Sequence, residues 1–273
     1  MNIKHLMGLC LMALLTTLTC QAQCEQQNTA FNGGEDLNYQ LYFNWKFIWI
    51  KAGTARLNIT DATYQGQPAY RCHLITTGSK RTDRFFMMRD TLTSYVTRNL
   101  VPLYYRKGAL EGSRYYVDEV WYSYPEGQGV HLNQRYKNND EPVVTRTATN
   151  DACTYDMASM LLRARSFDAT NYRVGQRLEF PLADGTSVEK GTLIYRGKKN
   201  FKMDDTKITY RCLVFSYVEK SKGKEKEIVT FYITDDNNHM PVRLDLFLRF
   251  GTAKAFLRTA TGLRNPQTSI ISK

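Results

Sequence analysis

The sequence lacks the short motifs that mark common catalytic and metal sites. It has no Cys-x-x-Cys, His-Glu-x-x-His or Gly-x-Ser-x-Gly, so it gives no support to a redox dithiol, a zinc protease or a nucleophile elbow. Its 37 basic residues exceed its 26 acidic ones without forming a long block, and the Lys-rich stretch at 220–226 is typical of a hairpin tip. We therefore expect no cofactor, no metal ion and no nucleic-acid partner. The distributed positive charge predicts a general attraction to anionic envelope surfaces.

Only one apolar run is long, and it stands near the N-terminus at residues 6–15. This run is too short to cross a bilayer, and the small residues Cys20 and Ala22 are typical of a signal-peptidase site, so residues 1–22 are interpreted as a cleaved signal peptide. A lipoprotein with a lipidated Cys20 is the alternative, but the preceding Thr-Leu-Thr does not match the usual lipidation signal. We expect an exported protein of the periplasm or outer-membrane surface, soluble rather than lipid-anchored, with no later transmembrane segment.

The middle of the chain contains one pattern twice. Ala-Tyr-Arg-Cys-His-Leu-Ile at 69–75 returns as Thr-Tyr-Arg-Cys-Leu-Val-Phe at 209–215, and a Gly-Thr pair precedes each copy. Such self-similarity predicts two related β-modules. Arg71 and Arg211 hold equivalent places, where two guanidinium groups could bind an anionic headgroup or a carboxylate of the protein itself. The alternative is that both are solvated residues on the outside of their strands.

Four cysteines remain after the predicted cleavage, and four cysteines permit three pairings. Export would allow disulfides to form. The repeat favours a Cys72–Cys212 bond, provided that the equivalent strands lie side by side. The alternative is that both are small buried residues of their strands.

Alternation of apolar and polar residues dominates the rest of the sequence. Apolar side chains occupy the odd positions from 37 to 49, a period of two that predicts a β-strand with one aromatic face. Similar segments recur on both sides of one amphipathic helix with Asp151 as its predicted cap. The pattern predicts a mainly antiparallel β protein: a large open or flattened barrel, or two related half-barrel modules, with one connecting α-helix.

The predicted organisation follows from these segments. A signal peptide (1–22) precedes an N-terminal β-module (23–150), a connecting helix (151–166), a C-terminal β-module (167–264) and a tail (265–273). We expect the two modules to form one compact domain.

Four stretches resemble a known family. Gly-Glu-Asp-Leu-Asn-Tyr at 34–39, Ala-Gly-Thr-Ala at 52–55, the segment 155–163 and the turn 234–243 together are similar to the exported bacterial family catalogued as domain of unknown function 3108. The resemblance implies an envelope-associated β protein whose family has no established catalytic residues. The residues that carry it are Gly34, Glu35, Tyr39, Gly53, Asp156, Ser159, Arg163, Asp235, Pro241 and Arg243.

Catalysis has one weak candidate in the sequence. Glu35 could meet Asp90 or Asp156 in a cleft as the general acid and base of a hydrolase acting on envelope material. The alternative is that Glu35 accepts backbone hydrogen bonds and Asp156 anchors the helix. We expect a protein that is not an enzyme.

The abundant aromatic residues suggest a binding role. The leading hypothesis is that a curved sheet holds a lipid, glycan or other amphiphilic envelope component in an aromatic-lined hollow. The candidate lining residues are Tyr39, Trp45, Trp49, Phe86, Tyr105 and Trp121, although such residues are also common in cores. A scaffold or assembly factor that offers an aromatic face or a free strand edge to an outer-membrane protein is the second hypothesis.

Overall fold

The structure is a computed structural model that describes residues 24–45, 48–203, 206–221, 223–248 and 251–272. The predicted signal peptide and Cys20 lie outside these residues. The strands are β1 (Asp36–Trp45), β2 (Ile48–Tyr64), β3 (Gln67–Gly78), β4 (Met88–Thr97), β5 (Pro102–Glu111), β6 (Arg114–Ser123), β7 (Val130–Asn138), β8 (Val144–Asn150), β9 (Arg177–Asp184), β10 (Ser187–Lys202), β11 (Thr209–Ser221), β12 (Lys224–Thr234), β13 (Pro241–Leu248), β14 (Gly251–Thr261) and β15 (Ile270–Ser272). The helix α3 (Met157–Ala164) separates β8 from β9.

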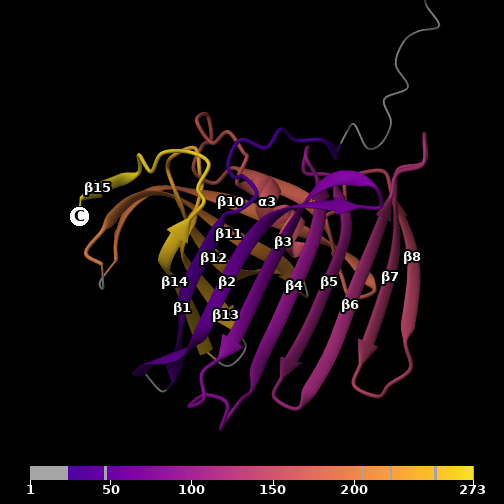
Figure 1. The fold of residues 1–273 in the computed structure, drawn as a ribbon, viewed down its shortest axis with the longest axis horizontal. Coiled ribbons are helices and arrows are strands. Elements are labelled where there is room, and N and C mark those ends of the chain that lie inside the picture. The colour runs from indigo at the N-terminus through magenta and orange to yellow at the C-terminus, as the bar shows by residue number, and fades with distance from the viewer. Residues whose placement is uncertain (1–23, 46–47, 204–205, 222, 249–250, 273) are drawn as a thin grey trace, which may run out of the picture.

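All fifteen strands belong to one open antiparallel sheet. Its order is β8-β7-β6-β5-β4-β3-β2-β1-β14-β13-β12-β11-β10-β9, and β15 pairs with β11. The first eight strands form one layer, and the sheet continues through the β1–β14 pair into the strands that lie behind this layer in Figure 1. The predicted mainly antiparallel β fold with one connecting helix is therefore confirmed. Of the predicted architectures, the structure has the open one, because the end strands β8 and β9 do not pair with each other. Among the described residues no helix is long and apolar enough to span a membrane.

The core lies on the sheet face that carries α3. Leu37, Ile59, Val96 and Val120 are fully buried on the first eight strands, and Leu162 of α3 belongs to the same cluster. Met160 of α3 instead packs with a second cluster on β9–β12. The helix thus fills the space between the two parts of the sheet.

The helix begins later than the sequence pattern predicts, at Met157 instead of 151. Tyr155 precedes it and forms a parallel bridge to Leu182, so the chain before the helix covers the edge of β9. The cap is Asp156, whose carboxylate accepts hydrogen bonds from the backbone N–H groups of Ala158 and Ser159, so the prediction of Asp151 as cap is wrong. The predicted tail also contains structure, because β15 pairs with β11.

The two copies of the repeated pattern occupy matching places in their meanders. The copies lie on β3 and β11, and the Gly-Thr pairs lie on β2 and β10. Both halves therefore share a strand order, as the repeat requires, and the duplication itself stays a prediction.

The predicted Cys72–Cys212 bond does not form. The disulfide joins Cys24 to Cys153, while Cys72 and Cys212 are free and buried. Matching strands are not adjacent here, because five strands separate β3 from β11 in the sheet. Burial raises the pKa of both free thiols to about 12, which keeps them protonated and unreactive.

The disulfide should contribute strongly to stability. It closes a loop of 129 residues, so replacing both Cys24 and Cys153 by Ser should lower the free energy of unfolding by about 2–5 kcal/mol in urea titrations. Reductant should destabilise the native protein and leave this double variant unchanged. A urea midpoint of the native protein that does not move with reductant would contradict the assignment. The variant Cys72→Ala, which keeps the disulfide, should retain the sensitivity to reductant.

Candidate functional site

Two of the family-like stretches meet at a buried ion pair with Arg165, which lies two residues beyond a third. The guanidinium of Arg165 donates to both carboxylate oxygens of Glu35, at 2.5 and 2.9 Å, and to the carbonyl oxygen of Asn238 at 2.9 Å. Neither charged side chain is exposed to solvent, and the ring of Phe31 lies 5.2 Å from the guanidinium carbon. The pair therefore joins the start of β1, the end of α3 and the turn between β12 and β13.

The contacts of Glu35 and Asp156 give no support to the carboxylate pairs that the sequence suggested. Glu35 is held by the fork of Arg165 and has no exposed atoms for a substrate to reach. Asp156 caps α3 and also accepts a hydrogen bond from Ser94, and burial raises its pKa. Asp90 does not lie beside Asp156. It stands near the start of β4, whereas Ser94, which donates to Asp156, lies four residues further along the same strand. The alternative role of Asp156, anchoring the helix to the sheet, is what its contacts show.

The other family-motif residues hold the fold together. Tyr39 donates its hydroxyl to the carbonyl oxygen of Pro241 at 2.9 Å, and Arg163 donates to the carbonyl oxygen of Cys24 at 2.7 Å. A Cβ at Gly53 would stand 2.1 Å from the carbonyl oxygen of Thr77, so no larger residue fits at this position. Gly34 adopts a positive φ, and Ser159 completes the capping box of α3. Asp235 forms ion pairs with Arg211 and Lys198, and Arg243 forms one with Asp245.

Sequence reasoning missed Arg165 and Asn238. Their positions in the sequence could have pointed to them, because Arg165 lies two residues after the family-motif residue Arg163 and Asn238 lies inside the family-like turn 234–243. Neither spacing nor periodicity showed which of the two arginines would turn inward.

The predicted aromatic residues do not line one hollow. Tyr39 and Tyr105 are buried in the core, whereas Trp49 and Phe86 are 41% and 45% exposed. Trp121 lies on the other face of the sheet against Tyr104, with ring centroids 5.4 Å apart. The side chain of Trp45 lies outside the described residues.

A register shift explains the position of Trp49. The pairing of β1 with β2 slips between Leu41 and Tyr42, so that Trp49 stands opposite Asn44 and not opposite an inward residue. A one-residue slip moves side chains to the opposite face. The alternation from 37 to 49 therefore does not describe one continuous face.

Arg71 and Arg211 also fail to form a pair. Arg211 donates through Nε to the Asp235 carboxylate at 2.9 Å and through Nη2 to the carbonyl oxygen of the same residue. Arg71 stands opposite Tyr95, and its buried Nε has no hydrogen-bond partner among the described residues. One guanidinium thus binds a carboxylate of the protein, as one alternative allowed, but the two do not make a symmetric clamp.

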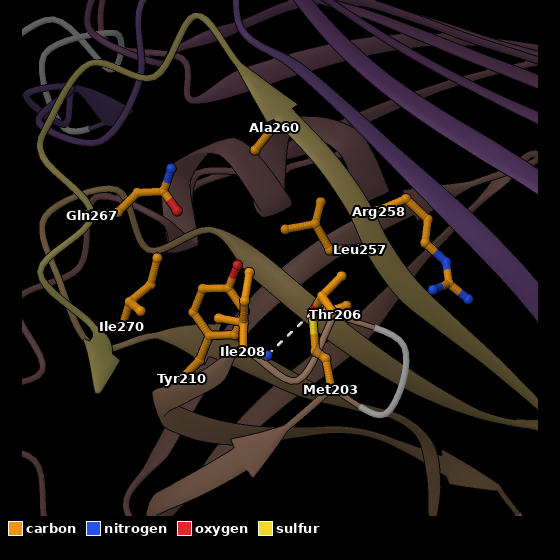
Figure 2. Close-up of a pocket in the computed structure, with 9 residues that line it drawn as sticks. All are labelled: Met203, Thr206, Ile208, Tyr210, Leu257, Arg258, Ala260, Gln267 and Ile270. Atoms are coloured by element: carbon orange, nitrogen blue, oxygen red, sulfur yellow. Dashed lines mark hydrogen bonds between the residues drawn. The ribbon is translucent and has the colours of Figure 1, made fainter. Parts of the chain in front are cut away.

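A small pocket of about 240 Å³, lined by both apolar and polar side chains, lies where β14 approaches the turn of the β10–β11 hairpin. The hairpin bends over the sheet here, because Phe201 of β10 stacks on Phe256 of β14 at 6.1 Å. Figure 2 shows the pocket lined by Met203, Thr206, Ile208, Tyr210, Leu257, Arg258, Ala260, Gln267 and Ile270. Gln267 lies in the connection between β14 and β15, Ile270 is the first residue of β15, and together they close one side of the pocket.

Two polar groups of the pocket have no internal partner. The hydroxyl of Tyr210 and the side-chain amide of Gln267 make no hydrogen bond within the part of the chain that the structure describes. Burial raises the pKa of Tyr210, so its hydroxyl stays neutral and can both donate and accept. Arg258, by contrast, donates to the hydroxyl of Tyr42 at 3.0 Å. An apolar wall with a few unpaired polar groups is the usual form of a small-molecule site.

The fold and this site define the class of protein: a mainly antiparallel, barrel-like β protein with a small pocket of mixed polarity. The model of the protein family of unknown function DUF3108 matches residues 38–258, so the chain belongs to this family. A comparison with curated proteins finds no match.

Two solved structures are similar in fold. The beta-barrel-like protein of the domain of unknown function DUF1849 from Brucella abortus shares 11% identity at a TM-score of 0.53, covering 85% of this chain and 98% of that one. A protein from Bacteroides fragilis with a YmcC-like fold shares 6% identity at a TM-score of 0.35, covering 86% of this chain and 99% of that one. The first likeness supports the barrel-like fold alone.

The buried ion pair predicts a large effect of single substitutions. Arg165→Met should lower the free energy of unfolding by about 3–5 kcal/mol, because it leaves the Glu35 carboxylate buried without its cation. Adding Glu35→Leu should recover a substantial part of this loss in urea titrations. A control is Arg56→Met, which removes an exposed partner of Asp36 and should cost less than about 1 kcal/mol. Equal losses for Arg165→Met and Arg56→Met would contradict this account.

A second buried carboxylate predicts a dependence on pH. Asp118 is 3% exposed, one of its oxygens has no partner among the described residues, and burial together with Asp184 raises its pKa to about 6. The native state therefore holds this proton up to a higher pH than the unfolded chain, and the ionised carboxylate destabilises the fold as pH rises from about 4 to about 6.

Asp118→Asn should accordingly stabilise the protein at pH 7 by on the order of 2–3 kcal/mol and have little effect near pH 3.5. Unfolding free energies of the variant and native protein across this range give the test. The exposed Asp140→Asn change is the matched control and should show no such trend. A difference that does not vary with pH would show that Asp118 is not the titrating group.

Proposed function

We propose that this protein is a non-enzymatic, exported envelope protein that binds a small amphiphilic molecule in the pocket of Figure 2. The observation that carries the proposal is the Tyr210 hydroxyl, which has no hydrogen-bond partner among the described residues and lies in a pocket where apolar side chains such as Met203, Ile208 and Leu257 alternate with polar ones. The apolar part of the ligand would lie against Met203, Ile208 and Leu257. Its hydroxyl, carbonyl or carboxyl group would reach Tyr210 and Gln267.

The size of the pocket limits the ligand. At about 240 Å³ it is smaller than the roughly 300–1,000 Å³ typical of drug-sized sites. It suits a single ring or the end of one chain, and not a complete lipid. The ligand class is therefore a small amphiphile, or one end of a longer one.

Two features support export. The Cys24–Cys153 disulfide requires a compartment that allows oxidation, and disulfides are rare in the cytosol. The apolar run at residues 6–15 has the composition of a signal peptide.

A scaffold role is the second candidate, and the edge of β8 favours it. β9, at one end of the strand order, is covered by Tyr155, whereas no described strand pairs with the outer edge of β8. β8 is largely exposed and rich in Thr, and such an edge can accept a strand from a partner. Cross-linking in cells that gives a reproducible protein adduct through β8 would favour this role.

Ligand binding can be tested by filling the pocket. Isothermal titration with 1-decanol and decanoate should show binding to the native protein, and Ile208→Trp should abolish it because the larger ring occupies the cavity. Tyr210→Phe should weaken binding about 5- to 15-fold through loss of one hydrogen bond. The exposed Val174→Trp change is the control and should bind normally.

Native mass spectrometry of protein purified from its own envelope adds an independent readout. A small bound molecule is expected, and it should be absent from the Ile208→Trp protein. If neither alcohol nor acid binds and no molecule copurifies, the binding role is wrong. Unchanged binding by Ile208→Trp would place the ligand elsewhere.

A further inference from the structure

The exposed apolar side chains gather at one end of the sheet. Because the strands are antiparallel, β1, β3, β5 and β13 all finish at this end, which is lower in Figure 1. The β3–β4 loop and the adjoining ends of β2 and β13 carry seven large apolar residues that are each at least 38% exposed, and these define what we call the aromatic end: Ile48, Trp49, Phe85, Phe86, Met87, Phe247 and Leu248. By contrast, the pocket lies near the end of β14, at the opposite end of the sheet.

Hydrogen bonds and pairing hold these segments next to one another. The carbonyl oxygen of Ala52 accepts from Ser79 N and Thr82 Oγ1, both at 2.8 Å, which fixes the β3–β4 loop beside β2. Leu248 stands opposite Gly251 at the end of the β13–β14 pair, and a Cβ at Gly251 would lie 2.9 Å from the ring of Phe43 on β1. The exposed apolar side chains in and beside three separate connections therefore lie at one end of the molecule.

Unpaired positive charge surrounds these apolar groups. The same segments carry Lys51, Lys80, Arg81, Arg84 and Lys254, and none of these five makes an ion pair within the described residues. Lys254 lies over the ring of Trp49, with its Nζ 4.3 Å from the centroid. The acidic residue of the β3–β4 loop, Asp83, is already neutralised by Arg89. The aromatic end is thus both apolar and cationic.

We propose that the aromatic end binds the surface of an anionic lipid bilayer. Exposed Trp and Phe side chains at one end of a protein are suited to the boundary between headgroups and acyl chains, and adjacent Lys and Arg side chains bind anionic headgroups. A protein partner would favour a flat, continuous face, whereas these side chains project from separate turns. The charge complements anionic lipid, and the site does not depend on the pocket proposed above.

Vesicle cosedimentation tests the proposal. The native protein should bind phosphatidylcholine vesicles that contain 30% phosphatidylglycerol at least tenfold more tightly than pure phosphatidylcholine vesicles at ~0.1 M salt, and ~0.5 M salt should weaken this binding. A blue shift of tryptophan emission on binding would report the transfer of Trp49 out of water.

Two variants separate the apolar and cationic contributions. Phe85→Ser with Phe86→Ser should reduce binding at least tenfold, and circular dichroism should show that the fold of this variant is retained. Lys80→Gln, Arg81→Gln and Arg84→Gln together should reduce binding at low salt and flatten its salt dependence. The control Arg173→Gln with Val174→Ser changes one charge and one exposed apolar residue away from this end and should bind normally, as should the pocket variant Ile208→Trp.

Three results would overturn the proposal. These are no binding of the native protein to either vesicle, equal binding to both, and unchanged binding by the Phe85→Ser, Phe86→Ser variant. A dimer in solution that this variant dissociates, without vesicle binding, would identify the aromatic end as a contact between copies of the chain.

Discussion

The Glu35–Arg165 ion pair is the constraint on which the rest of the structure depends. Removing two charges from water is costly, and the cost is offset only when geometry and additional hydrogen bonds are good. Here the carboxylate accepts both arms of the guanidinium, and Asn238 supplies a further acceptor. Because these groups come from β1, the end of α3 and the β12–β13 turn, the pair can form only when both halves of the sheet have assembled around the helix.

The ion pair also divides the molecule into two unlike ends. The disulfide, the Asp156 cap and the ion pair lie together at the end where α3 joins the sheet, and they satisfy the buried polar groups there. The connections at the other end are held by hydrogen bonds of partly exposed groups, such as those of Ser79 and Thr82 with the carbonyl oxygen of Ala52. Phe85 in the β3–β4 loop is 86% exposed and so contributes little to the core.

Much of the fold follows from local pattern, and much of the candidate site does not. Alternation and turn residues predict the antiparallel strands and the helix, because strand and helix periods are properties of neighbouring residues. The Cys24–Cys153 bond, the inward turn of Arg165 and the pocket depend on residues far apart in the sequence. The slip after Leu41 is also invisible to a strict period of two, and it moved Trp49 to the opposite face.

The aromatic content supports several structural roles and not one hollow. Tyr104 and Tyr105 are neighbours on β5, so one must point to each face, and only Tyr105 reaches the core. On the other face, Tyr104 stacks between Tyr64 at 6.0 Å and Trp121 at 5.4 Å, so each ring covers part of the next. These rings cover part of the second face of the sheet with the protein's own side chains. The aromatic residues that the sequence suggested as one ligand lining therefore divide into core residues such as Tyr105, a ring cluster on the outer face that includes Trp121, and exposed residues such as Trp49.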